Sequence, residues 1–227
     1  NCPMSQKNVV KEWSETTAKM VAGYDNLLKI DKVEVATTPK ELVHKVDKIK
    51  LYRYTRETPA KFKTPIVISY ALVNRHDMLD IQPDRSFVRN LLGLGFDVYI
   101  IDWGYPTKAD KFVTLDDYVN WYLDSVVDFV RKNNDVEKVN LMGICQGGTL
   151  SVIYSCLHAE KIQNLVTLVT PVDFSTNDGL LFRWSKNINF DRLVDTYRTV
   201  PGDFMNNGFS MLKPMMKVQK YMNILDI

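Results

Sequence analysis

The sequence lacks the features that mark a nucleic-acid-binding or a transmembrane protein. Its formal net charge is only +2 over 227 residues, with no long basic or acidic block, so no nucleic-acid partner is expected. Its longest apolar runs, PIVISYALV and NLVTLVTPV, have nine residues each, whereas a transmembrane helix needs about 20. We therefore expect a soluble protein without a transmembrane segment.

Cysteine is scarce, and its spacing argues against two further kinds of site. The chain has three cysteines, Cys2, Cys145 and Cys156. An odd number disfavours a disulfide framework, and the spacing is not that of a zinc site, so we expect no bound metal. The first residues, NCPMSQKNVV, show no export signal and lack an initiating methionine. A reducing, intracellular compartment fits these observations best.

Apolar residues make up 45% of the chain, and their spacing alternates along the sequence between two patterns. Short apolar runs typical of buried strands alternate with stretches of helical periodicity. The expected strands are 48–54, which looks like an edge strand, then 64–72, 96–104, 137–144 and 163–174. The expected helices are 8–30, 85–95, 115–133 and 147–160. This alternation predicts an α/β fold with a mainly parallel sheet covered on both faces, whose ligands bind at the carboxyl ends of the strands.

The same pattern divides the chain into three regions. Residues 1–37 are expected to form an N-terminal helical segment, and residues 38–174 hold the alternating strands and helices. In residues 175–227 the pattern is lost, and Pro201 and Pro214 break the short helical pieces. We expect this last region to be part of a cap inserted over the sheet.

The most informative motif is VNLMGICQGGTL, residues 139–150, which reads G-x-C-x-G-G around Cys145. A strand, a reactive side chain in a sharp turn and a helix together form a nucleophile elbow. Gly143, Gly147 and Gly148 are expected where any side chain would collide with the helix or the neighbouring strand. The N-terminus of the helix points its N–H groups toward the sulfur, which favours the thiolate.

Two backbone N–H groups are expected to stabilise the oxyanion that forms when the thiol attacks a carbonyl group. One belongs to Gln146, the residue after the nucleophile, and the other to Val73, in the loop after the strand 64–72. In the alternative interpretation, Cys145 is only a small buried residue in a glycine-rich turn. Cys156, on the same helix, is expected to have that structural role.

A thiol in this position points to acyl transfer. It accepts an acyl group from another thiol with little change in bond energy, and the resulting thioester stays reactive toward an incoming hydroxyl group. Cys145 therefore suits transfer from a coenzyme A thioester to an alcohol better than it suits plain hydrolysis. Coenzyme A is then part of the substrate, and no separate cofactor is expected.

From about Thr38 to its last residue, the chain resembles the poly(3-hydroxyalkanoate) synthases, which have the α/β-hydrolase fold and a lipase-like box that carries cysteine. The resemblance rests on the pieces ALVNRHDMLDIQPDRSFVRNLLGLGFDVYIIDWG, GICQGGT, TPVDF and KYMNILDI. The short N-terminus and the tail resemble the class III synthases most, and class IV next. The resemblance implies that Cys145 takes a 3-hydroxyacyl group, short-chain and specifically 3-hydroxybutyryl, from coenzyme A and adds it to a polyester.

The resemblance also implies partners and a location. A class III enzyme works with a second, PhaE-like subunit, and a class IV enzyme with a PhaR-like one, so a homodimer or hetero-oligomer is expected. The ligands are 3-hydroxyacyl-CoA and the growing polyester. The enzyme is expected in the cytoplasm, associated with polyhydroxyalkanoate granules.

The family mechanism also needs an aspartate and a histidine, and the chain order in this fold is nucleophile, acid, histidine. No histidine follows His158. At about 1.5 Å per helical residue, this ring should lie ~20 Å from Cys145, at the far end of the helix. The triad Asp and His are therefore expected outside this chain, which resembles a C-terminally truncated fragment that is inactive alone.

Four further residues are weaker candidates. His44 precedes the first expected strand and should lie at the surface. His76 follows Val73 in the loop on the oxyanion side and could approach the pocket, but the chain order argues against a catalytic role. It is expected to lie at the surface of that loop. Asp102 and Asp173 each end a strand and are candidates for supporting the nearby loops rather than for the triad acid.

Two other functions compete with a polymerising acyltransferase. The first is a cysteine hydrolase of the same fold, such as a thioesterase or a dienelactone-hydrolase-like enzyme. The second is a non-catalytic, granule-associated or partner-binding module in which the elbow serves only as scaffold. Acylation of Cys145 and the fate of its acyl group distinguish the three.

Overall fold

The computed structural model describes the following residues of the chain: 11, 13–19, 21–22, 35–73, 75–176 and 179–212. The chain divides into two compact units. The larger unit comprises residues 34–178 and 189–199, and the other comprises residues 1–33, 179–188 and 200–227. The larger unit contains the sheet and the expected nucleophile.

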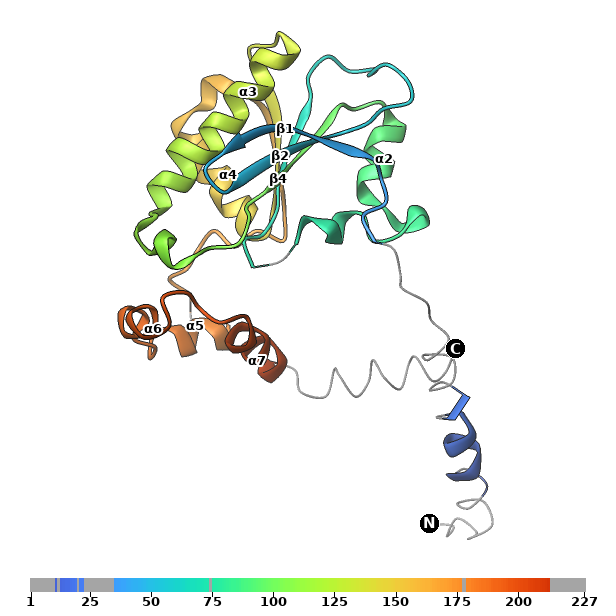
Figure 1. Ribbon diagram of the computed structural model, residues 1–227, viewed down its shortest axis with the longest axis vertical. Helices are drawn as coiled ribbons and strands as arrows, with labels where there is room; N and C mark the ends of the chain where they lie inside the picture. Colours follow the sequence, from blue (N-terminus) through green and yellow to red (C-terminus); the bar gives the residue numbers. More distant parts are fainter. Residues whose placement is uncertain are drawn as a thin grey trace. The chain divides into compact units, whose positions relative to one another are not determined.

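One mixed sheet organises the larger unit (Figure 1). Its strands lie in the order β1-β2-β4-β3-β5-β6. Its strands are β1 Lys40–Val46, β2 Ile49–Tyr54, β3 Ile66–Ser69, β4 Val98–Asp102, β5 Val139–Ile144 and β6 Ile162–Leu168. The ladders from β4 through β3 and β5 to β6 are parallel, and β2 runs antiparallel to both β1 and β4. The predicted α/β class with a mainly parallel sheet is confirmed.

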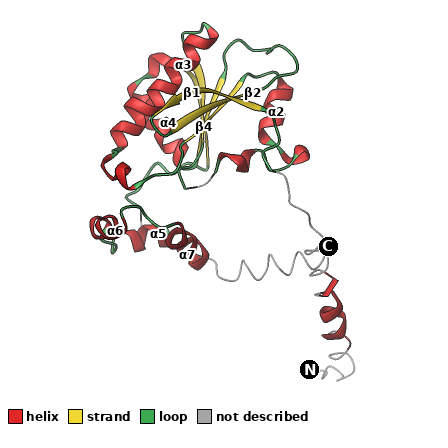
Figure 2. Cartoon of the chain, viewed as in Figure 1, coloured by secondary structure: helices red, strands yellow, loops and turns green. Residues whose placement is uncertain are grey.

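Helices cover both faces of this sheet, with α2 on one face and α3 and α4 on the other (Figures 1 and 2). Their bounds are α2 Phe87–Leu94, α3 Asp124–Asn134 and α4 Gln146–Leu157. Shorter helical turns are η1 His76–Leu79, η2 Pro83–Arg85, η3 Lys108–Phe112 and η5 Ala159–Lys161. A π-helix, η4 Asp117–Leu123, runs directly into α3. The single helix expected over 115–133 thus consists of two helical types.

Alternation along the strands builds a separate core on each face. In β4, Tyr99 and Ile101 pack in the cluster with the π-helix, α3 and α4, whereas Val98 and Ile100 pack in the cluster with α2. Because successive side chains of a strand point to opposite faces, a strand covered on both sides needs a continuous apolar run. The sequence VYII meets this requirement.

Three expectations about the sheet are wrong. The segment 48–54 is not an edge strand, because β1 pairs with it on one side and β4 on the other. His44 does not precede the first strand but lies within β1, partly buried, with its ring stacked on Phe129 at 4.7 Å between centroids. The strand expected over 163–174 ends at Leu168.

The predicted N-terminal and cap regions are only partly described. Within the expected helix 8–30, the described residues between 11 and 22 are helical. The region after Phe174 holds α5 Leu180–Ser185, α6 Phe190–Tyr197 and α7 Gly202–Leu212, of which α5 and α7 contact one another. The tail KYMNILDI lies outside the described residues. None of the described helices is both long enough and apolar enough to span a membrane.

Candidate active site

Cys145 occupies the tight turn between β5 and α4. The strand ends at Ile144 and the helix begins at Gln146, so this turn is a single residue. Its φ of 56° and ψ of −127° are rare for a residue other than glycine, which is the strained backbone of a nucleophile elbow. Its N–H donates to the Leu168 carbonyl at 3.0 Å, and its own carbonyl accepts from the Gly148 N–H at 2.9 Å. Hydrogen bonds on both sides therefore hold the half-buried cysteine in this conformation.

Each of the three elbow glycines faces a neighbour that leaves no room for a side chain. A Cβ at Gly143 would lie 2.7 Å from the Ser151 hydroxyl oxygen of α4. A Cβ at Gly147 would overlap two backbone carbonyl oxygens at the end of β3, and one at Gly148 would overlap the Thr170 side chain. The glycines thus let α4 start in contact with the ends of β3 and β6.

The segment expected to supply the second oxyanion donor follows β3. The Leu72 N–H in this segment donates to the Gln146 side-chain oxygen Oε1 at 3.1 Å. Val73 is half exposed, and its N–H makes no hydrogen bond among the described residues. The structure therefore brings this segment to the first residue of α4, and the assignment of the Val73 and Gln146 N–H groups as oxyanion donors stays a prediction.

Tyr70 is a neighbour of Cys145 that the motif does not predict. It is partly buried in the same cluster as Cys145, and the Trp103 indole N–H donates to its backbone carbonyl at 3.0 Å. Burial, and then the electrostatic influence of nearby Cys145, raise the pKa of the Tyr70 phenol above its usual value. Its place directly after the buried strand β3 was the one signal that could have marked it as a site residue.

An apolar groove of about 490 Å³ opens beside the elbow. Its walls include Leu72 from the segment after β3, Gln146 and Ile153 from α4, and Val172 and Phe174 from the segment after β6. Its volume lies within the range of ligand-binding clefts, about 300–1,000 Å³. The groove reaches Gln146, the residue that follows Cys145, and its mainly apolar lining suits an aliphatic group.

This combination of sheet order, elbow and covering helices agrees with one known fold. The alpha/beta hydrolase fold family matches residues 64–223 of the chain. The chain belongs to this family. A second match, to the N-terminus of poly-beta-hydroxybutyrate polymerase (PhaC), covers residues 6–91.

Curated relatives narrow the position of the chain within the α/β-hydrolases. The poly(3-hydroxyalkanoate) polymerase subunits PhaC of Thiocystis violacea and Allochromatium vinosum are each 48% identical, over 96% of this chain and 62% of each relative. The corresponding subunit of Synechocystis sp. is 43% identical, over 95% of this chain and 60% of the relative. The resemblance to the poly(3-hydroxyalkanoate) synthases is therefore confirmed, and the chain spans about three fifths of the length of these relatives.

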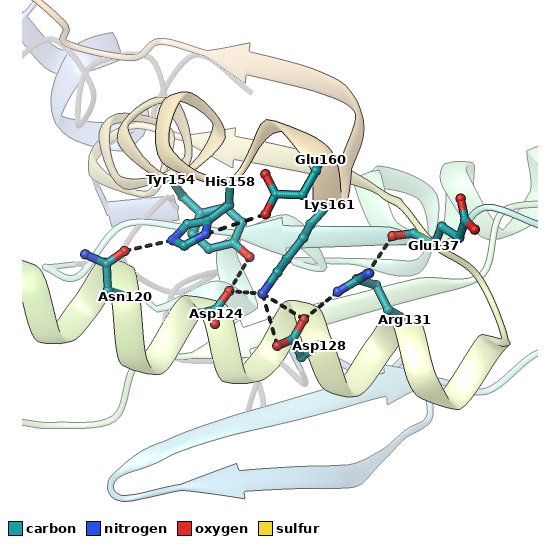
Figure 3. A network of polar contacts seen from close by, with 9 residues as sticks. All are labelled: Asn120, Asp124, Asp128, Arg131, Glu137, Tyr154, His158, Glu160 and Lys161. Atoms are coloured by element: carbon teal, nitrogen blue, oxygen red, sulfur yellow. Dashed lines mark hydrogen bonds and ion pairs between the residues drawn. The ribbon is translucent and has the colours of Figure 1, made fainter.

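His158 lies at the C-terminal end of the α/β-hydrolase nucleophile helix, as its spacing from Cys145 predicts. It is the residue after the end of α4, and its Nε2 lies 2.8 Å from the Asn120 side-chain oxygen of the π-helix. Its Nδ1 lies 3.9 Å from the Glu160 carboxylate (Figure 3). The ring is thus part of a network at the far end of α4 and does not serve the thiol.

The same network fixes α4 against α3 through Asp124. The buried Tyr154 hydroxyl donates to Asp124 Oδ1 at 2.7 Å, and Lys161 Nζ donates to the same oxygen at 2.7 Å (Figure 3). Burial, and then the hydrogen bond to Asp124, raise the pKa of Tyr154 far above its usual value, so the phenol remains a donor. Since α4 begins directly after Cys145, these bonds at its other end help to set the direction of the helix.

Replacing Tyr154 with phenylalanine is expected to lower the free energy of unfolding by about 1–2 kcal/mol, because a hydrogen bond to a charged group is lost while Lys161 keeps Asp124 paired. Urea unfolding followed by tryptophan fluorescence measures the change. Tyr197→Phe, at a half-exposed position of α6, is the matched control and should leave the midpoint unchanged. Equal stability of the Tyr154→Phe variant and the unaltered chain would contradict the importance of this bond.

His44 cannot serve Cys145, since it lies in β1, at the opposite end of the strand order from β5 and β6. Its Nε2 lies 2.9 Å from the Ser125 hydroxyl of α3. Burial lowers the pKa of its ring, which stacks on Phe129. The expectation that His44 is a surface residue is therefore wrong.

His76 lines a small cavity of about 90 Å³ at the carboxyl ends of β3 and β4, together with Val73 and Asp102. The ring is buried, and its Nε2 lies 3.0 Å from Lys40 Nζ and 3.3 Å from the Asp77 carboxylate. Burial, and then the charge of Lys40, lower its pKa against the opposing carboxylates. The expectation of a loop-surface residue is wrong, but the ring is engaged by neighbours other than Cys145.

Both aspartates that were expected to end strands hold the backbone of a nearby turn, although only Asp102 ends a strand and Asp173 follows the end of β6. Asp102 Oδ1 accepts the Gly104 N–H at 3.0 Å. Asp173 Oδ1 accepts both the N–H and the hydroxyl of Ser175, at 2.8 and 2.7 Å, and these hydrogen bonds lower its pKa. Both contacts agree with the supporting role expected for these residues.

Proposed function

We propose that Cys145 is the nucleophile of an acyltransferase that polymerises 3-hydroxyacyl groups from coenzyme A thioesters into a polyester. The observation that carries the proposal is a cysteine in strained elbow geometry, within a chain 48% identical to poly(3-hydroxyalkanoate) polymerase subunits PhaC. The apolar groove beside the elbow supports an aliphatic acyl group as the ligand. We propose 3-hydroxybutyryl as the acyl group, and the cytoplasmic surface of polyhydroxyalkanoate granules as the location.

The proposed chemistry consists of two acyl transfers. The Cys145 thiolate attacks the thioester carbonyl, the carbon–sulfur bond to coenzyme A breaks, and coenzyme A leaves as a thiol with the proton that Cys145 gave up. The hydroxyl oxygen of another unit then attacks the acyl-cysteine carbonyl and forms an ester bond. The hydroxyl proton returns to the released cysteine sulfur, so that the site is restored.

The whole reaction needs groups that this chain does not bring to the thiol. All three histidines of the chain, His44, His76 and His158, have neighbours other than Cys145. We propose that the triad Asp and His belong to a part of the protein outside these 227 residues, in keeping with the chain's coverage of 62% of its relatives. We also propose a second synthase subunit as a partner, because several relatives are named as subunits.

The proposal is tested by incubating the chain with 3-hydroxybutyryl-CoA and analysing it by peptide mass spectrometry. We expect one 3-hydroxybutyryl group on Cys145, release of an equal amount of coenzyme A, and no polymer. Repeated release of coenzyme A with free 3-hydroxybutyrate would favour a cysteine hydrolase instead. Absence of both acylation and iodoacetamide alkylation at Cys145 would favour a non-catalytic module.

A further inference from the structure

We infer that the Gln146 side chain is a positioning residue, which selects and places the second oxyanion donor. The inference rests on the proposed function, because an oxyanion forms only if Cys145 is acylated. Its basis is the 3.1 Å hydrogen bond in which the Leu72 N–H donates to Gln146 Oε1. This bond joins residues 74 positions apart in the sequence, at the meeting point of α4 and the segment after β3.

The bond decides which N–H group of the segment remains available. The Leu72 N–H is already used by the carboxamide, so it has no free hydrogen to offer an oxyanion. The next N–H, that of Val73, makes no hydrogen bond among the described residues. Because the Gln146 side chain occupies the Leu72 N–H, Val73 supplies the second oxyanion donor.

The same bond holds the segment in place. Residues 71–73 make no other hydrogen bond within the described part of the chain. The nearest support upstream is the Trp103 indole N–H, which donates to the Tyr70 carbonyl at 3.0 Å. Val73 is half exposed, so packing alone restrains it weakly. Without the carboxamide, the donor loses the contact that ties it to the nucleophile's own helix.

Two reactions at the Cys145 sulfur distinguish an effect on the position of the oxyanion donor from a general effect on the thiol. Acylation by p-nitrophenyl acetate passes through a tetrahedral oxyanion and needs the donors. Alkylation by iodoacetamide displaces iodide at a saturated carbon and forms no oxyanion, so it reports only the access and nucleophilicity of the thiol. The ratio of the two rates therefore measures the oxyanion site.

The test compares Gln146→Met, which keeps the length of the side chain but has no strong acceptor, with the unaltered residue. Both carry Cys2→Ser and Cys156→Ser, so that Cys145 is the one remaining thiol. The acylation rate at Cys145 is expected to fall about tenfold or more, while the alkylation rate changes by less than about twofold. Gln163→Met, at an exposed position of β6, is the matched control and should alter neither rate.

Four results would overturn the inference. Acylation of Gln146→Met at the unaltered rate would show that the carboxamide places no donor, and equal falls in both rates would show a general effect on the thiol. If Gln146→Met does not fold, Gln146→Asn replaces it, because its shorter side chain keeps the amide but cannot reach Leu72. This variant should also lose acylation rate while it keeps its alkylation rate. If the two rates do not separate in this way, the inference is overturned equally. A chain with Gln146 that is alkylated but never acylated at Cys145 would refute the proposed function, and the inference with it.

Discussion

Gly147→Ala is expected to destabilise the larger unit by about 3 kcal/mol or more, the upper end of what an inserted methyl group costs in a packed core. The added Cβ would overlap the backbone carbonyl oxygens of Ser69 and Tyr70. Both are main-chain atoms, so the clash cannot be relieved by a side-chain rotation. The Ser69 hydroxyl also donates to the Gly147 carbonyl at 3.1 Å, and any shift of α4 lengthens that bond.

Urea unfolding followed by tryptophan fluorescence measures this loss, and Gly93→Ala is the matched control. Gly93 lies on the exposed side of α2, where an added Cβ meets no atom within 4 Å. Alanine in a helix interior is about 1 kcal/mol better than glycine, so this control should be as stable as the unaltered chain or slightly more stable. A Gly147→Ala variant that unfolds at the unaltered midpoint would show that α4 does not start in close contact with β3.

The elbow could be predicted because its determinants are local. Strand, turn and helix all lie within residues 139–157, and the G-x-C-x-G-G spacing places each glycine where a particular neighbour approaches. The central strands could be predicted for a similar reason, because a strand buried on both faces requires a continuous apolar run. The helical spacing between Cys145 and His158 also predicted that His158 lies at the far end of α4.

The errors arise where tertiary contacts outweigh local pattern. Strand β1 has the sequence KELVHKV, in which most side chains are polar or exposed, and its strand conformation depends on pairing with β2 across a turn at Asp47. The burial of His76 depends on Lys40, which is distant in the sequence. The bond between Leu72 and Gln146 likewise joins segments that no local window contains.

Cys145→Ser is expected to reduce acylation by p-nitrophenyl acetate at this position at least about 100-fold, as Cys145→Ala should. A thiol supplies a few per cent of its reactive anion at pH 7 without help, whereas an alcohol needs an adjacent base to become a nucleophile. None of the three histidines is engaged with residue 145, because their ring nitrogens lie against Lys40, Ser125 and Asn120. The elbow geometry alone therefore cannot activate a serine.

Peptide mass spectrometry of chains exposed to the ester for set times measures the rate at residue 145. Cys156, expected from the sequence to be buried, is in fact exposed on α4. Cys156→Ser is therefore the matched control, because it makes the same atomic change at an exposed position and should leave that rate unaltered. A serine at 145 that acylates as fast as the cysteine would mean that a base reaches the elbow from within this chain. The placement of the triad Asp and His outside these residues would then be wrong. A large loss of acylation rate in the serine variant, together with acylation of the cysteine, would instead show that the thiol reacts without a base from this chain. The base that the full reaction needs would then come from the rest of the protein.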